Sequence, residues 1–121
     1  MQSSNVVLLQ SDPKIAQALV ASLSESFRRV QVVSSLDDLR VSVAKYRTGV
    51  AIVDMETIPL SDVQHLSREF PDVSIVCNHR LADDEMWTAA LSAGAADCCA
   101  SNEPQTIVNA SLRGATHAAT A

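Results

Sequence analysis

The sequence predicts an α/β fold built on a doubly wound, five-stranded parallel sheet. Short apolar runs alternate along the chain with longer segments in which apolar residues recur at helical spacing. The connections between these segments are short, as expected where strands and helices pack in alternating layers. A parallel sheet covered on both faces accounts for this order. The preference for right-handed crossovers leaves the doubly wound arrangement as the most economical topology.

Each of the five strands is predicted from an apolar run. Most of the runs are rich in Val, Leu or Ile, which suit a buried strand. They lie at residues 6–9, 30–33, 50–53, 73–77 and 95–100. The last run is the weakest, because Ala and Cys are poorer strand formers than Val or Ile.

The five segments that follow these strands are predicted to be helices. Asp12 before Pro13, and Ser35 before a periodic segment, are signals of a helix N-terminus. Gly49 is expected to end the second helix. We expect helices at residues 13–27, 35–46, 59–70, 82–92 and 101–112.

Length, charge and cysteine content limit the class of protein. The 121 residues predict a single domain over residues 1–121, with a core at about 5–113 and a helix tail or linker at 114–121. The net charge of −5 argues against nucleic-acid binding, because an acidic surface repels phosphates. No apolar run is long enough to span a membrane and no signal peptide is recognisable, so we expect a soluble, cytoplasmic domain. The three cysteines lack metal-binding spacing, which fits a reducing compartment.

Asp54 is the main candidate for a functional residue. It directly follows the apolar run 50–53 and would therefore stand at the carboxyl end of a central strand. In doubly wound folds, ligands bind in the crevice at this edge of the sheet. We expect Asp54 to border that crevice, where a ligand or a phosphoryl group could reach it.

Three segments resemble the receiver domains of bacterial two-component response regulators, which have a CheY-like, flavodoxin-like fold. They are VVLLQSDP at 6–13, VAIVD at 50–54 and ALSAGAADCCASNEP at 90–104, and their order and spacing extend the resemblance over about residues 6–112. The resemblance implies the strand order 2-1-3-4-5 and a role in phosphorelay signalling. It also implies that the aspartate of the third strand, here Asp54, accepts a phosphoryl group from a histidine kinase with the help of Mg²⁺.

Several positions around Asp54 depart from the pattern of that family. The family ends its first strand with two acids that hold the metal, where this chain has Gln10 and Ser11. The Ser or Thr at the end of the fourth strand corresponds to His79, or to Asn78 if the loop differs by one residue. Further along, the family's Lys and its aromatic switch residue are replaced by Ser101 and Cys98.

These departures predict an atypical member of the family, a pseudo-receiver. Mg²⁺ prefers hard oxygen ligands that include carboxylates, and the neighbours of Asp54 are neutral. A phosphorylated Asp54 would carry roughly two negative charges without the lysine that usually offsets them. We therefore expect slow or absent phosphorylation, no catalytic residue and no required cofactor. Any metal site would be weak and limited to Asp54 and Asp12.

Four neighbouring residues have competing interpretations. Asp12 is expected to cap a helix, and would become a metal ligand only if the first strand slipped by one residue. His79 could titrate beside Asp54 as a proton switch, although a solvent-facing loop position is favoured. Glu56 is expected at the rim of the pocket. Arg80 could supply a cation near Asp54, but a solvated position is the simpler expectation.

The cysteines and the tryptophan also allow two interpretations each. Cys98 and Cys99 should point to opposite faces of the sheet, and Cys77 should lie near one of them. A redox pair is conceivable, but buried thiols more often act as small apolar side chains. Trp87, the only tryptophan, either marks a contact surface or packs on the sheet.

Three functional hypotheses follow. The favoured one is a non-enzymatic signalling module that acts through protein contacts. Its partners would be itself, a histidine kinase or other signalling domain, or an output domain fused after residue 121. The contact face would be formed by the helix 82–92, the strand 95–100 and the last helix. The second hypothesis is a working phosphoacceptor with an altered Mg²⁺ site. The third, a small-molecule-binding flavodoxin-like domain, is disfavoured because the loops lack glycine-rich phosphate cradles.

Overall fold

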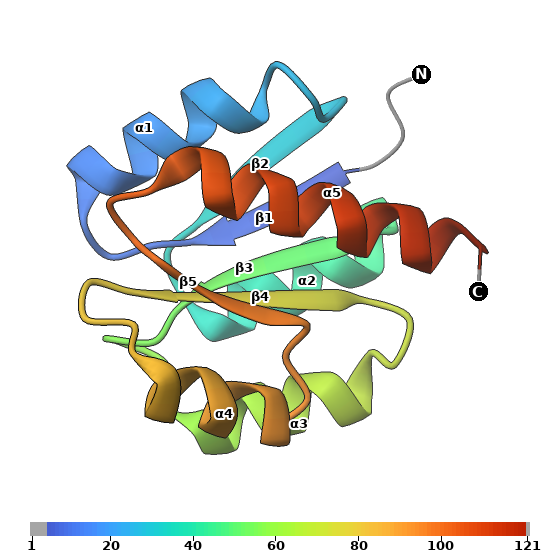
Figure 1. Ribbon diagram of the computed structural model, residues 1–121. Helices are drawn as coiled ribbons and strands as arrows, with labels where there is room; N and C mark the ends of the chain where they lie inside the picture. The colour runs from blue at the N-terminus through green and yellow to red at the C-terminus, as the bar shows by residue number, and fades with distance from the viewer. Residues whose placement is uncertain (1–4, 121) are drawn as a thin grey trace.

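All five strands lie in one parallel sheet in the order β2-β1-β3-β4-β5 (Figure 1). The computed structural model describes the backbone of residues 5–120 and the side chains of residues 5–114. The strands are β1 (Asn5–Leu9), β2 (Arg29–Val33), β3 (Val50–Asp54), β4 (Ser74–His79) and β5 (Asp97–Ala100). The predicted fold class and strand order are confirmed.

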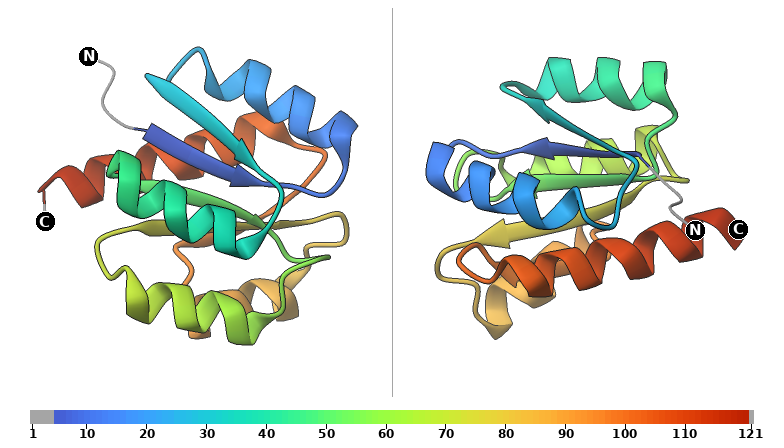
Figure 2. Two further views of the ribbon diagram at one scale, coloured as in Figure 1. Left: turned by 180° about the vertical axis from the view of Figure 1, so that it is seen from behind. Right: turned by 90° about the horizontal axis from the view of Figure 1, so that it is seen from above.

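Helices cover both faces of the sheet (Figure 2). They are α1 (Pro13–Leu23), α2 (Leu36–Tyr46), α3 (Leu60–Glu69), α4 (Asp84–Ser92) and α5 (Pro104–Thr120). Helices α1 and α5 pack on one face, where Leu19, Leu23 and Ile107 join the buried cluster. Helices α2, α3 and α4 pack on the other face and contribute Leu39 and Leu66 to a second cluster. None of the helices in the described part of the chain is both long and apolar enough to cross a bilayer.

Successive residues of the central strands supply the two clusters in alternation. Val6 and Leu8 of β1 face α1 and α5, whereas Val7 and Leu9 face α2 and α3. Both sets are almost completely buried, so residues 6–9 of β1 and 50–53 of β3 are all apolar. A polar side chain within such a strand has to find its partners inside the protein, and Asp54 at the end of β3 is in that position.

The helix ends differ from the sequence prediction in two places. Helix α1 ends at Leu23, because Ser24 is its C-cap and the chain turns there before Phe27. Helix α2 ends at Tyr46 with Arg47 in the left-handed conformation (φ 51°), so Arg47 takes the place that was predicted for Gly49. Helix α5 continues to Thr120, past the apolar residues up to Leu112 that predicted it, which fits the helix-tail alternative for 114–121. The predicted caps Asp12 and Ser35 both accept hydrogen bonds from backbone N–H groups of the first helical turn.

Helix α5 approaches the start of β4 very closely. At Gly114, a side-chain Cβ would lie against Ser74 Oγ and 2.7 Å from Ser74 Cβ. Such contacts are too short for a real Cβ atom, so only glycine allows α5 to pack at this distance. Ser74 Oγ is itself buried and has no hydrogen-bond partner among the described residues.

Candidate functional site at the carboxyl edge of the sheet

Asp54 ends β3 at the edge where ligands bind in doubly wound folds, but no part of it is exposed. Its neighbour in the sheet is Asn78 of β4, which is also completely buried. After Asp54 the chain makes a tight turn, in which the N–H groups of Thr57 and Ile58 donate to the Asp54 carbonyl. The acid is therefore enclosed by the ends of the strands and by the loop that follows it.

Four donors hold the Asp54 carboxylate. Its Oδ2 accepts from the hydroxyl of Ser11, from the Ser11 N–H at 3.2 Å and from the Thr57 hydroxyl at 2.9 Å. Its Oδ1 accepts from the Glu56 N–H at 2.9 Å. Burial alone would raise the pKa of Asp54, but these hydrogen bonds outweigh it and hold the pKa below its ordinary value of 3.8. Asp54 is an ionised group whose Oδ2 accepts from three donors of the protein and whose Oδ1 accepts from one.

Beside Asp54, three neutral side chains form a second hydrogen-bond network. The Oδ1 of Asn78 accepts from Gln10 Nε2 and from Ser101 Oγ, each at 2.8 Å. The Nδ2 of Asn78 donates to the Val53 carbonyl at 3.0 Å. Gln10, Asn78 and Ser101 are almost completely buried. This network joins the ends of β1, β3, β4 and β5 without using any charge.

The residues at this edge do not fit a Mg²⁺ ion. Mg²⁺ needs near-octahedral oxygen ligation with at least one available carboxylate. The Asp12 carboxylate instead caps α1 by accepting from the Lys14 N–H at 2.9 Å. The Oε1 of Gln10 accepts from the Asp12 N–H at 3.0 Å, and Asp54 is engaged as described above. Within the described residues, no cluster of three or more His, Cys, Asp or Glu side chains could hold a metal ion.

An ion pair crosses the rim of the site. The guanidinium of Arg80, in the loop after β4, lies 2.9 Å from the Glu56 carboxylate, in the loop after β3. Both side chains keep contact with solvent, so we assign the pair little stabilising free energy. Its charge is directed at Glu56, and no hydrogen bond or ion pair joins Arg80 to Asp54. His79 lies at the end of β4, where its Nδ1 accepts from the Leu81 N–H at 2.9 Å.

The cysteines are buried on both sides of the sheet. Cys77 is paired with Cys98 in the register of β4 and β5, and both belong to the cluster under α2, α3 and α4. Cys99 belongs to the opposite cluster, as the alternation along a strand requires. Burial raises the pKa of Cys77 and of Cys99 to about 12, with smaller contributions from the neighbouring cysteines and, for Cys99, from Asp97. Burial also raises the pKa of Cys98. All three are free thiols that pack as apolar side chains.

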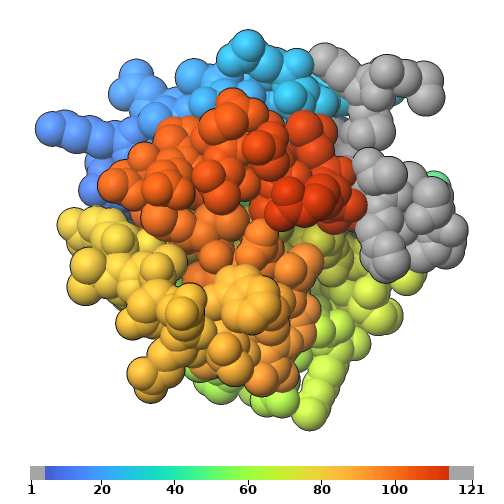
Figure 3. Space-filling model, in the orientation of Figure 1, coloured from blue at the N-terminus to red at the C-terminus, as the bar shows by residue number. Residues whose placement is uncertain are grey.

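Asp97 at the start of β5 connects α4 to α5. Its Oδ1 accepts from the indole N–H of Trp87 at 3.0 Å, and its Oδ2 accepts from Arg113 at 3.0 Å. Figure 3 shows α4 and α5 on the same side of the molecule, where each contacts the edge strand β5 from an opposite face of the sheet. The Trp87 side chain is tied to the sheet by its nitrogen while 47% of the residue remains exposed. The hydrogen bond to Asp97 supports packing on the sheet, and a contact surface at Trp87 stays a prediction.

Of the predicted site residues, the structure brings together Asp54, Ser11, Gln10, Ser101 and the Glu56 backbone. It leaves the side chains of Asp12, His79 and Cys98 outside these two networks: Asp12 is a helix cap, His79 faces its own loop, and Cys98 packs in the core. Asn78, the second alternative for the position at the end of β4, is the residue that enters the network. Thr57 was not predicted. Its spacing of three residues after Asp54, in a turn of hydrogen-bonding residues, is the signal that could have indicated it.

The overall structure is similar to solved structures of receiver domains. It superposes on the N-terminal receiver domain of a response regulator from Bacteroides fragilis with a TM-score of 0.82 at 19% identity, over 92% of this chain and 95% of that one. A response regulator from Thermotoga maritima gives a TM-score of 0.83 at 14% identity, over 94% of this chain and 98% of that one. The receiver domain of NarL from Mycobacterium tuberculosis gives 0.80 at 20% identity, over 96% and 98%.

Similarity at the level of sequence is much weaker. No family model matches the chain, and no curated protein matches it in sequence. At identities of 20% or below, the solved structures establish the fold of this chain but not its chemistry. The chemistry has to be argued from the residues described above. The chain therefore has the fold of the receiver domains of two-component response regulators.

Proposed function

We propose that this protein is a cytoplasmic pseudo-receiver: a non-enzymatic signalling domain that acts through protein contacts and does not depend on phosphorylation of Asp54. The observation that carries the proposal is the state of the Asp54 carboxylate. It is completely buried, and its two oxygens accept four hydrogen bonds from the protein, three of them on Oδ2. The carboxylate is thereby a structural centre that holds the loops after β1 and β3.

A carboxylate in this state is a poor nucleophile for phosphoryl transfer. Attack requires a free lone pair aligned with the phosphorus atom, together with cations that offset the developing charge. Oδ2 accepts from three donors, Oδ1 accepts from one, and the network beside the carboxylate is neutral. A phosphoryl group on Oδ2 would have to displace Ser11 and Thr57, and on either oxygen it would bring roughly two negative charges. Arg80, the cation at the rim, is already paired with Glu56.

The proposed contact surface is the face formed by α4, β5 and α5. Trp87 is held in place by Asp97 and is half exposed, as expected of an aromatic anchor at an interface. Candidate partners are a second copy of the chain, another signalling domain such as a histidine kinase, and a fused output domain. Sedimentation velocity of wild type and of Trp87→Asp tests the first of these. Self-association through this face would be weakened by the substitution, and self-association that Trp87→Asp leaves unchanged would contradict it.

Incubation with acetyl phosphate and Mg²⁺, followed by intact-protein mass spectrometry, tests the central claim. We expect no phosphoryl adduct on the wild-type protein. The positive control is Gln10→Asp/Ser11→Asp/Ser101→Lys, which returns the family's acids and lysine to the corresponding positions, after circular dichroism has shown that it is folded. We expect this variant to gain some Mg²⁺-dependent adduct. An adduct on the wild-type protein that Asp54→Asn abolishes would show that the chain is a working phosphoacceptor.

A further inference from the structure

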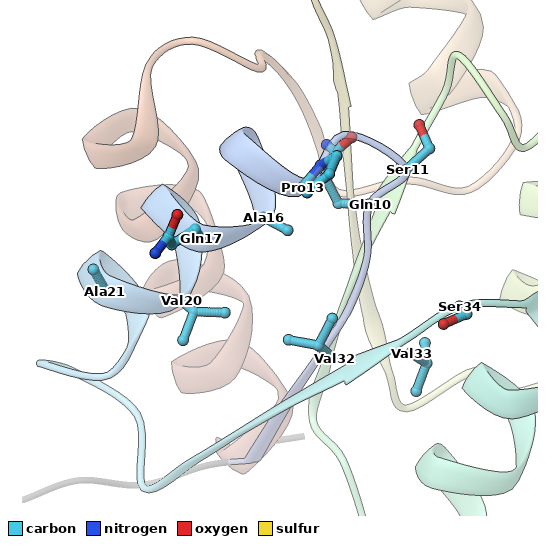
Figure 4. A pocket seen from close by; sticks show the side chains of 10 residues that line it. All are labelled: Gln10, Ser11, Pro13, Ala16, Gln17, Val20, Ala21, Val32, Val33 and Ser34. Atoms are coloured by element: carbon cyan, nitrogen blue, oxygen red, sulfur yellow. The ribbon is translucent and has the colours of Figure 1, made fainter.

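A cavity of about 760 Å³ lies between α1 and the edge strand β2. Ala16 and Val20 of α1 point across it toward Val32 of β2 (Figure 4). Pro13 closes one end together with Gln10, at the junction of β1 and α1. The volume lies within the range of about 300–1,000 Å³ that is typical of small-molecule sites.

The cavity lies along the side of α1 that faces β2. Helix α1 packs against α5 and buries Leu19 and Leu23 in the core that the two helices share. Its side toward β2 carries Ala16 and Val20, which are only partly buried against the same cluster and do not cover Val32. As a result Val32 is 48% exposed, although Val30 on the same face of β2 packs against the core. Strand β2 is at the edge of the sheet, so no further strand covers this apolar position.

The lining is mostly apolar, has polar side chains from Gln10, Ser11, Gln17 and Ser34, and contains no charged residue. This neutrality is unusual in a chain whose net charge is −5. An ionic ligand would lose hydration here without finding a counter-charge, which is costly. Gln10 and Ser34 supply neutral hydrogen-bonding groups. Gln10 uses one N–H and one lone pair within the protein, so its amide retains capacity for a further hydrogen bond.

We propose that this cavity binds an uncharged, mostly apolar small molecule that carries a hydroxyl or carbonyl group. The apolar body would cover Ala16, Val20 and Val32, and the polar group would lie toward Gln10. Uncharged walls of this kind are complementary to a neutral ligand. This cavity differs from a nucleotide or flavin site, which the sequence analysis disfavoured. It lies beside α1 and has no glycine-rich phosphate-binding loop.

The cavity adjoins the Asp54 site through two residues. Gln10 and Ser11 both line its end, and each also holds the site: Gln10 donates to Asn78, and Ser11 donates to Asp54. A ligand that shifts the loop after β1 would therefore change the hydrogen bonds of both networks. Occupancy of the cavity would provide the domain with an input that needs no phosphoryl group. The binding site itself does not rest on the proposed function, because Asp54 does not line the cavity.

A neutral fluorescent probe tests the binding site. PRODAN is an uncharged naphthalene ketone whose emission shifts to the blue in an apolar site. We expect saturable binding to the wild-type protein and affinity at least about tenfold weaker for Ala16→Phe, whose ring would project into the cavity between Val20 and Val32. Thr88→Phe, on exposed α4, is the matched control and should bind as wild type. Circular dichroism should show that both variants are folded.

Two further measurements separate the alternatives. In ¹H–¹⁵N spectra, PRODAN should shift the amides of residues 10–21 and 32–34, together with the side-chain amide of Asn78. Absence of binding, or binding that Ala16→Phe leaves unchanged, would overturn the inference. So would a wild-type dimer that Ala16→Phe converts to a monomer in light scattering, because the groove would then be covered by a second copy. Each of these results leaves the phosphorylation experiment unaffected.

Discussion

Asn78 of β4 is the register partner of Asp54 on the adjacent strand β3, and both side chains are completely buried. They belong to adjacent networks that do not share a donor. Asp54 is held by hydroxyl and backbone N–H groups, whereas Asn78 connects Gln10 to Ser101. Together the two networks fill the carboxyl edge of the sheet with internal hydrogen bonds. Because so many partners depend on Asp54, its main measurable role should be in stability.

Replacement of Asp54 should therefore destabilise the protein. Asp54→Asn removes a charged acceptor and directs an amide toward the donors of Ser11 and Thr57, so we expect a loss of about 2 kcal/mol in the free energy of unfolding. Urea denaturation measures it. Asp72→Asn, at an exposed loop position, is the control and should change stability by less than about 0.5 kcal/mol. Equal stability of wild type and Asp54→Asn would show that the four hydrogen bonds carry little energy.

The stability that Asp54 contributes should depend on pH in the acid range. Its pKa in the folded protein is lowered, so protons bind more tightly to this carboxyl group in the unfolded chain. The contribution is complete above the unfolded pKa of about 4 and is lost as the pH falls through the lower, folded value. The difference between wild type and Asp54→Asn should therefore shrink between about pH 5 and pH 2. A difference that grows on acidification would mean that the folded pKa is raised.

The thiols should be unreactive in the folded protein. With the pKa of Cys77 and Cys99 raised to about 12, the reactive thiolate is scarce at pH 8, and burial blocks access. We expect Ellman's reagent to react at least about a hundredfold more slowly with the native protein than with the chain in guanidinium chloride. All three thiols should be counted in the unfolded, unreduced protein. Recovery of only one would instead indicate a disulfide between two of them.

The close packing of Gly114 on Ser74 predicts that Gly114→Ala destabilises the wild-type protein but stabilises a variant in which Ser74 is replaced by glycine. Gly114→Ala should gain up to about 1 kcal/mol in helix propensity but lose about 1–3 kcal/mol through overpacking against Ser74, for a net destabilisation. In a Ser74→Gly background the obstruction is gone, so Gly114→Ala should become stabilising. Thermal or urea unfolding of the four proteins measures the coupling. Additive effects would mean that α5 shifts away from β4 without cost.

The fold was predictable because its signals are redundant. Each strand is an apolar run, and each crossover is constrained by the handedness of the sheet, so errors at single residues do not change the topology. Helix ends depend on one local conformation, and that is where the prediction failed. Gly49 was a reasonable cap by its lack of a side chain, but Arg47 adopts the left-handed conformation two residues earlier.

The site was predictable in position but not in contacts. The run before Asp54 fixed where the acid would lie, whereas the choice between Asn78 and His79 depended on a single residue in the loop before α4. Strand register decides that choice by pairing Asn78 with Asp54. The role of Thr57 depends on the direction of a hydroxyl group in a turn. The cavity beside α1 depends on how that helix packs against the sheet. The first has a weak local signal, the spacing of Thr57 from Asp54, and the second has none.

The bridge formed by Asp97 has a consequence for how information could pass through this domain. One carboxylate accepts from the indole of Trp87 and from the guanidinium of Arg113, so the two helices that flank β5 are both joined to the same residue of that strand. A displacement of β5 at Asp97 would therefore act on α4 and α5 together.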